Sequence, residues 1–100
     1  MANYKLTNNA ESNLDNIYEY SILNFGLEIA RKYMLGLHEC FDLLAKNPTW
    51  GSNYGFICNG LLRYEYRSHA IYYINDKKNI LILNILGGKQ DPILSVEFNF

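Results

Sequence analysis

The sequence predicts an α+β fold: an N-terminal strand, then an antiparallel helical hairpin packed on a small antiparallel β-sheet. Two observations carry this prediction. Between residues 10 and 45, apolar side chains recur at steps of three and four, as on one face of a helix. From residue 61 onward they alternate, as in strands with one buried face. With 100 residues, 49% of them hydrophobic and 19% charged, residues 1–100 are expected to form a single domain with its own core.

Two helical segments separated by a short connection are expected to form the hairpin. Asn8 or Asn9 can cap the first helix, and Gly26 ends it. Asn47-Pro48 ends the second helix, because proline disfavours helical backbone in the residue before it. The predicted inner face of the first helix consists of Ala10, Leu14, Ile17, Tyr18, Ser21 and Phe25. That of the second consists of Ala30, Tyr33, Met34, Leu37, Phe41, Leu44 and Ala45.

The strands are expected to follow the order β-α-α-β-β-β. The N-terminal strand, residues 4–7, is short and is placed at a sheet edge. Alternation predicts strands at residues 61–67 and 69–75. Residues 80–86 are nearly all apolar, which is typical of a central strand covered on both faces. Residues 95–100, where valine and phenylalanine alternate with polar residues, are the candidate for an additional C-terminal strand.

The totals exclude several classes of protein. A net charge of −1 provides no long-range attraction to nucleic acid, so we expect no direct sequence-specific nucleic-acid binding. The two cysteines, Cys40 and Cys58, are too few for a disulfide scaffold and lack metal-ligand spacing, so no metal or cofactor is expected. Cys40 falls in the second helical pattern and is expected to be a buried free thiol. No signal peptide is recognised, and no apolar run approaches the roughly 18 residues of a membrane span, so we expect a cytoplasmic protein.

Six segments, in order, carry a family resemblance. They read AESNLDNIYEY followed by FG, ARKYMLGL, LLAKNPTWG, GLLRY, SHAIYY and ILGGKQDP. Together with the order of elements, they resemble the ParE branch of the RelE/ParE superfamily over nearly the whole chain. Proteins of this superfamily are the toxins of bacterial type II toxin–antitoxin pairs. The resemblance implies a cytoplasmic, non-enzymatic toxin that inhibits DNA gyrase by binding and is neutralised by a ParD-like antitoxin encoded beside it.

Two other functions stay open. RelE members share the fold and cut mRNA on the ribosome, so a ribosome-dependent endoribonuclease is one alternative. The other is a degenerate toxin that only binds its antitoxin, because the chain departs from the family pattern at four positions. Gly87 stands where a histidine is usual, Lys89 where an arginine is usual, Ser52 where a basic residue often occurs, and Arg67 where a glycine precedes Ser-His.

Ribonuclease chemistry requires a general base, a general acid and cations that hold the phosphate. His69 is the most plausible imidazole, but a turn or strand-end residue hydrogen-bonded to backbone is the favoured interpretation; His38 is expected on a helix surface. Ser68 and His69 are adjacent and are expected on opposite faces of a strand, where they cannot pair as nucleophile and base.

The cationic residues also give little support to a ribonuclease site. Arg63 and Arg67 are expected to share one strand face, and with Lys89 they would form a small basic patch. The stretch DPILSVEFNF at the end contains no Arg, Lys, His or Tyr to complete a nuclease site. We therefore predict no catalytic residue.

Two binding surfaces are predicted instead. Nine tyrosines are more than so small a domain is expected to bury, so some rings are expected to line an apolar strip, unless they all close the core. The N-terminal strand would provide an open edge for strand addition. The predicted antitoxin-binding residues are Tyr4, Leu6, Tyr64, Tyr66 and Tyr72. The predicted target-binding residues are Arg63, Lys89, Asp91, Phe98 and Phe100.

Overall fold

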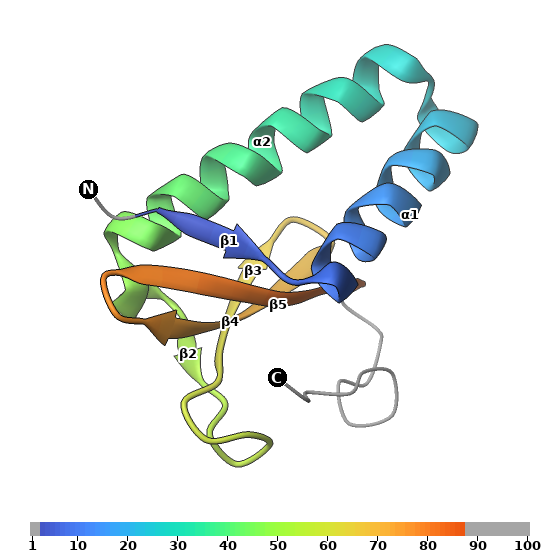
Figure 1. The fold of residues 1–100 in the computed structure, drawn as a ribbon. Coiled ribbons are helices and arrows are strands. Elements are labelled where there is room, and N and C mark those ends of the chain that lie inside the picture. The colour runs from blue at the N-terminus through green and yellow to red at the C-terminus, as the bar shows by residue number, and fades with distance from the viewer. Residues whose placement is uncertain (1–2, 88–100) are drawn as a thin grey trace.

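The computed structural model describes residues 3–87, in which a helical hairpin packs on a five-stranded sheet (Figure 1). The elements are β1 (Tyr4–Leu6), α1 (Asn8–Phe25), α2 (Leu27–Lys46), the short 3-10 helix η1 (Pro48–Trp50), β2 (Ser52–Asn53), β3 (Leu62–Tyr66), β4 (His69–Asp76) and β5 (Asn79–Gly87). The sheet order is β1-β5-β4-β3-β2. The predicted α+β fold is confirmed, with β1 at a sheet edge. The strand considered at residues 95–100 lies outside the described residues.

The sheet is mixed, because β1 pairs with β5 in parallel, with Tyr4 opposite Ile80 and Leu6 opposite Ile82. The other three strand pairs are antiparallel. The prediction of an antiparallel sheet is therefore wrong for the β1–β5 pair. The helical hairpin carries the chain from the end of β1 back toward its start (Figure 1). The later antiparallel turns then fix the direction of β5 independently of the residues in β1.

Helix α1 is capped by Thr7. The Thr7 Oγ1 accepts a hydrogen bond from the Ala10 backbone N at 3.1 Å and donates to the Leu83 carbonyl at 2.9 Å. Its extended backbone is typical of a helix cap. Asn8 and Asn9, the predicted caps, are instead the first two residues of the helix. One side chain thus both starts α1 and ties it to β5.

Gly26 joins the two helices, as predicted, in a backbone conformation that favours glycine. Its φ of 92° and ψ of 166° lie in a region that residues with a side chain rarely occupy. The Gly26 N–H donates to the Ile22 carbonyl at 3.0 Å and closes α1. The Gly26 carbonyl accepts from the Ala30 N–H at 3.1 Å and opens α2.

Gly26→Ala is expected to lower the free energy of unfolding by about 1–3 kcal/mol. A Cβ at this position would meet no atom within 4 Å, so the loss would come from backbone strain and not from a clash. Urea denaturation measures it. Leu23→Ala, at a side chain that is 85% exposed, is the control and is expected to stay within about 0.5 kcal/mol of the wild type. An unchanged unfolding midpoint for Gly26→Ala would contradict the argument.

The main core lies between the helices and the sheet. Its buried residues are Ala10, Leu14 and Ile17 of α1, Leu37, Cys40, Phe41, Leu44 and Ala45 of α2, and Ile71, Tyr73, Ile80, Ile82 and Ile85 of the sheet. The predicted inner faces of both helices are confirmed except at Phe25, which is 58% exposed. Phe25 is the last residue of α1, at the hairpin tip, which projects beyond the sheet (Figure 1). Cys40 is buried as predicted, and this burial raises the pKa of its thiol to about 11.

On the opposite face of the sheet, Tyr54, Ile57 and Cys58 of the loop of residues 54–61 pack against a second buried cluster. Backbone hydrogen bonds close this loop, including Tyr54 N to the Leu61 carbonyl at 2.8 Å. This cluster consists of Leu61, the last residue of the loop, with Ala70, Tyr72, Leu83 and Leu86 of the sheet. Strand β5 therefore lies inside the sheet and is buried on both faces, as its apolar sequence predicts. In the described part of the chain, no helix is long and apolar enough to cross a membrane.

Candidate functional site

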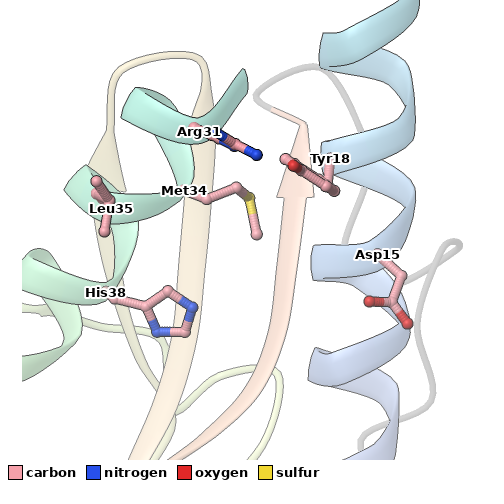
Figure 2. Close-up of a pocket in the computed structure, with 6 residues that line it drawn as sticks. All are labelled: Asp15, Tyr18, Arg31, Met34, Leu35 and His38. Atoms are coloured by element: carbon pink, nitrogen blue, oxygen red, sulfur yellow. The ribbon is translucent and has the colours of Figure 1, made fainter. Parts of the chain in front are cut away.

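A groove runs between α1 and α2. We call it the helical groove. It has a volume of about 370 Å³ and is lined by Asp15 and Tyr18 of α1 and by Arg31, Met34, Leu35 and His38 of α2. Figure 2 shows Arg31 and Met34 extending from α2 toward Tyr18 across the gap between the helices. Leu35 is 65% exposed, so an apolar side chain at the groove is available to a partner.

His38 connects the helical groove to the sheet edge. A hydrogen bond of 2.7 Å joins His38 Nδ1 to Tyr4 Oη of β1. The Phe41 ring packs edge-on against both, at 5.5 Å from His38 and 5.3 Å from Tyr4. Burial, and secondarily the charge of Asp42, raises the pKa of the Tyr4 phenol, which therefore stays protonated. His38 is thus a half-buried link between α2 and β1, and the prediction of a helix-surface residue is wrong.

A second groove lies on the other side of α2, against β3. We call it the sheet-edge groove. Its volume is about 270 Å³, and its lining comprises Gly36, Glu39, Cys40, Leu43, Trp50, Tyr64, Glu65, Tyr66 and Arg67. Leu43 and Trp50 are about half exposed, and the Trp50 and Tyr64 rings lie 6.3 Å apart. A side chain at Gly36 would overlap the Tyr66 hydroxyl, so glycine permits the close approach of α2 and β3 here.

The backbone edge of β3 is open beside this groove. Strand β2 pairs only with Leu62 and Arg63. The rest of β3, up to Tyr66, pairs with β4 on its inner side and has no strand neighbour on its outer side among the described residues. An open strand edge beside a partly apolar groove is suited to an added strand from another chain.

The structure separates the predicted antitoxin-binding residues. Tyr4 and Leu6 lie in β1 at one edge of the sheet, whereas Tyr64 and Tyr66 lie in β3 near the other edge. Tyr72 is only 2% exposed and belongs to the face opposite the helices. The expectation that Tyr72 lines an exposed strip is therefore wrong. The reason is that it lies on β4, an inner strand, beneath the 54–61 loop.

Arg63 is held within the molecule. Its Nε donates to Tyr72 Oη at 3.2 Å, and its Nη1 donates to Glu65 Oε1 at 2.7 Å. The guanidinium lies 5.5 Å from the centre of the Tyr54 ring and 5.9 Å from that of the Tyr72 ring. The Arg63 side chain is only 18% exposed. It therefore ties the 54–61 loop to the sheet through cation–π contacts and hydrogen bonds.

Arg67 does not join Arg63. It lies in the turn after β3 with a φ of 53°, and its guanidinium is 5.6 Å from the Tyr66 ring centre, near the helices. The expected patch of Arg63 and Arg67 on one face is therefore wrong, because strand alternation ends at Tyr66. The remaining predicted target-binding residues, Lys89, Asp91, Phe98 and Phe100, lie outside the described residues.

His69 bonds to a side chain rather than to backbone. Its Nδ1 lies 2.5 Å from Tyr33 Oη and 3.4 Å from Ser68 Oγ. The expectation that Ser68 and His69 lie on opposite faces of a strand and cannot hydrogen-bond is wrong, because Ser68 belongs to the turn and not to a strand. Their contact is nevertheless long for a hydroxyl hydrogen bond. Burial lowers the pKa of His69, so the imidazole is neutral at pH 7.

The chain that forms these grooves matches a known protein family over most of its length. The family model of the ParE toxin of type II toxin–antitoxin systems, parDE, matches residues 4–92. The chain belongs to the ParE toxin family. A relative, Toxin ParE1 of Caulobacter vibrioides (strain ATCC 19089 / CIP 103742 / CB 15), is 30% identical over 73 residues, covering 73% of this chain and 76% of that protein. A solved structure, described as the chromosomal ParDE TA system from P. aeruginosa, shares the fold with a TM-score of 0.74. It is 24% identical and covers 87% of this chain and 96% of that one.

Three residues of this ParE toxin are exposed although the sequence did not predict their exposure. Leu35, Leu43 and Trp50 were not predicted as surface residues, yet each presents much of its side chain to solvent beside α2. Leu35 and Leu43 fall off the apolar stripe that the period of α2 defines. That displacement is the signal by which they could have been found. Trp50 carries no such signal, because its position follows from η1.

Tyr73 fixes η1, and with it Trp50 of this ParE chain. The Tyr73 hydroxyl, on a residue with 0% exposure, donates to the Pro48 carbonyl at 2.8 Å and accepts from the Gly51 N–H at 2.9 Å. Tyr73→Phe removes both bonds and is expected to lower the free energy of unfolding by about 1–3 kcal/mol. Thermal denaturation measures this loss. Tyr20→Phe, at a ring that is 63% exposed, is the matched control. Equal stability of the two variants would refute the buried role of the hydroxyl.

Within residues 3–87, no three His, Cys, Asp or Glu side chains gather in a way that could hold a metal ion. The two cysteines are free. The described surface of this ParE toxin includes a groove on either side of α2 and open strand edges at β1 and β3.

Proposed function

We propose that this ParE toxin acts in the cytoplasm by binding DNA gyrase, without catalysing a reaction, and that a ParD-like antitoxin neutralises it by covering the grooves beside α2. The observation that carries the proposal is the ParE family match over residues 4–92. The interactions of the residues that a nuclease would need support the proposal that the toxin does not catalyse a reaction. His69 Nδ1 is engaged in a hydrogen bond with Tyr33 Oη, and the Arg63 guanidinium is paired with Glu65.

The two grooves support a single antitoxin that wraps α2. Because both grooves share α2, one extended partner can occupy them together. The helical groove, with Met34 and Leu35 on it, suits the apolar face of an amphipathic helix. The sheet-edge groove, with Tyr64 and Tyr66, suits an extended segment that adds to the open edge of β3.

The N-terminal edge belongs to the same proposed surface. Tyr4 and Leu6 lie in an edge strand, and Tyr4 is hydrogen-bonded to His38 of the helical groove. Tyr72 contributes indirectly, because it supports Arg63 and Tyr54 from beneath. An antitoxin would therefore contact Tyr4, Leu6, Tyr64 and Tyr66, and not Tyr72.

The proposed target-binding surface is the sheet face opposite the helices. Arg63 lies there against the Tyr54 and Tyr72 rings, and Phe56 of the 54–61 loop, which is 78% exposed, packs beside Tyr54. Lys89, Asp91, Phe98 and Phe100 remain part of this proposal from their place in the sequence. Deletion of residues 95–100 tests it. A folded but non-toxic protein would support target binding by the C-terminus, and a folded, fully toxic one would contradict it. If the deletion is insoluble, the double variant Phe98→Ser/Phe100→Ser replaces it, with the same two outcomes.

Induced expression in bacterial cells tests the function itself. Gyrase inhibition predicts DNA-damage signalling and filamentous cells, both relieved when the antitoxin is expressed with the toxin. An immediate stop in translation would instead indicate mRNA cleavage. Neither effect, with the antitoxin still copurifying, would indicate a degenerate toxin that retains only antitoxin binding.

A further inference from the structure

A third hollow, the turn pocket, lies between the first turns of α2 and the turn that joins β3 to β4. Its volume is about 170 Å³, and it is lined by Ile29, Lys32, Tyr33, Tyr66 and Arg67. Both charged residues in this lining are cations. Neither belongs to an ion pair found among the described residues, where Arg63 and Glu65 form the salt bridge. Within the described part of the chain, the positive charge of the pocket is therefore uncompensated, in a protein whose net charge is −1.

Arg67 is oriented toward this pocket by the turn. Its positive φ of 53° directs the side chain back over Tyr66, with the guanidinium 5.6 Å from the ring centre. Among residues 3–87, only its Nε is engaged in a hydrogen bond, a long one of 3.4 Å to Tyr66 Oη. The two terminal nitrogens remain as donors for a ligand. A guanidinium stacked on an aromatic ring is preorganised to bind an oxyanion through two parallel hydrogen bonds.

The hydroxyls of the pocket supply further donors. Tyr33 Oη lies 2.5 Å from His69 Nδ1. When His69 is neutral, the Tyr33 proton is directed to Nδ1. When His69 is protonated, Nδ1–H donates to Tyr33 Oη and the Tyr33 proton is free to point into the pocket. The groups that face this pair are Ser68 of the turn, Tyr66 from β3 and Arg67, so a bound anion would be the negative charge that favours the protonated imidazole.

We propose that the turn pocket binds a phosphate group, held by Arg67 and Lys32 with Tyr33 and Tyr66 as hydroxyl partners. A phosphate has enough oxygens for donors arriving from both α2 and the turn, and the volume leaves room for little more than the group and its nearest substituent. The site is separate from the helical groove and from the Arg63 face, and it does not depend on gyrase being the target. The phosphate can be inorganic, a monoester on a nucleotide, or a diester of a nucleic-acid backbone.

Nuclear magnetic resonance of the full chain tests the proposal, with inorganic phosphate as the probe and chloride at matched ionic strength as the reference. Phosphate is expected to produce saturable shifts in the amides of Lys32, Tyr33, Arg67 and His69, and to raise the measured pKa of the His69 ring. The double variant Lys32→Gln/Arg67→Gln is expected to weaken binding at least tenfold. The matched control Lys46→Gln/Lys78→Gln, which removes two exposed cations that line none of the three grooves, is expected to leave it unchanged.

Three results would overturn the site: shifts that do not saturate, shifts that chloride reproduces, or saturable binding that Lys32→Gln/Arg67→Gln leaves intact. Two further probes distinguish the source of the phosphate. Deoxyadenosine 5′-monophosphate binding at least tenfold more tightly than inorganic phosphate would assign a monoester, and tighter binding of a dinucleoside monophosphate would assign a diester. If neither binds more tightly, the site is one for free phosphate.

Discussion

Phe41→Ala is expected to lower the free energy of unfolding by about 3–5 kcal/mol, a large part of the stability of a domain this size. Phe41 has 0% exposure and lies where α2 meets the sheet. Its ring contacts Tyr4 and His38, so its loss leaves a cavity at the junction of α2 and β1. Because close-packed interiors relax only partly around such a cavity, most of the lost packing energy is not recovered.

Urea denaturation followed by far-UV circular dichroism measures the Phe41 effect. Leu43→Ala, two residues further along α2 at a side chain that is 47% exposed, is the control and is expected to cost less than about 1 kcal/mol. Similar losses for the two variants would show that Phe41 is not the centre of the helix–sheet core.

Leu35→Asp is expected to weaken antitoxin binding by about 30-fold or more, equivalent to a loss of about 2 kcal/mol at an interface hot spot. Leu35 is 65% exposed at the helical groove, so it contributes little to the fold. An aspartate there would bring a charge into an apolar contact and would have to be desolvated when the antitoxin binds.

Titration calorimetry with the antitoxin measures the Leu35 effect, after thermal denaturation has shown that the variant is folded. Leu23→Asp, at the hairpin tip and outside the lining of either groove, introduces the same charge at a more exposed leucine and is expected to bind as the wild type does. If Leu35→Asp also bound normally, the antitoxin would not occupy the helical groove.

The elements of this fold follow from local sequence, and the pairing of distant ones does not. Gly26 and Pro48 mark the helix ends in the sequence, and the apolar run of β5 indicates burial on both faces. The parallel pairing of Tyr4 with Ile80 joins residues at opposite ends of the described chain. No periodicity in either strand encodes its direction, because the helical hairpin and the antiparallel turns between them set it.

The positions of the candidate binding residues were less predictable than the fold, because they depend on turns and on which strand is inner. In the sequence, Tyr72 cannot be distinguished from the other strand tyrosines. In the structure it is buried, because β4 is an inner strand of the sheet. In the sequence, strand alternation places Arg67 on the same sheet face as Arg63. In the structure, the left-handed backbone of Arg67 directs its side chain over Tyr66, on the opposite face of the sheet. The grooves beside α2 arise only when α1, α2 and β3 come together.

A supercoiling and cleavage assay with purified DNA gyrase, run with and without the antitoxin, tests the central claim most directly. We predict that the folded chain inhibits supercoiling or traps cleaved DNA, and that equimolar antitoxin relieves the effect. Full gyrase activity in the presence of folded toxin would contradict the claim, and mRNA cleavage on translating ribosomes would then be the activity to measure.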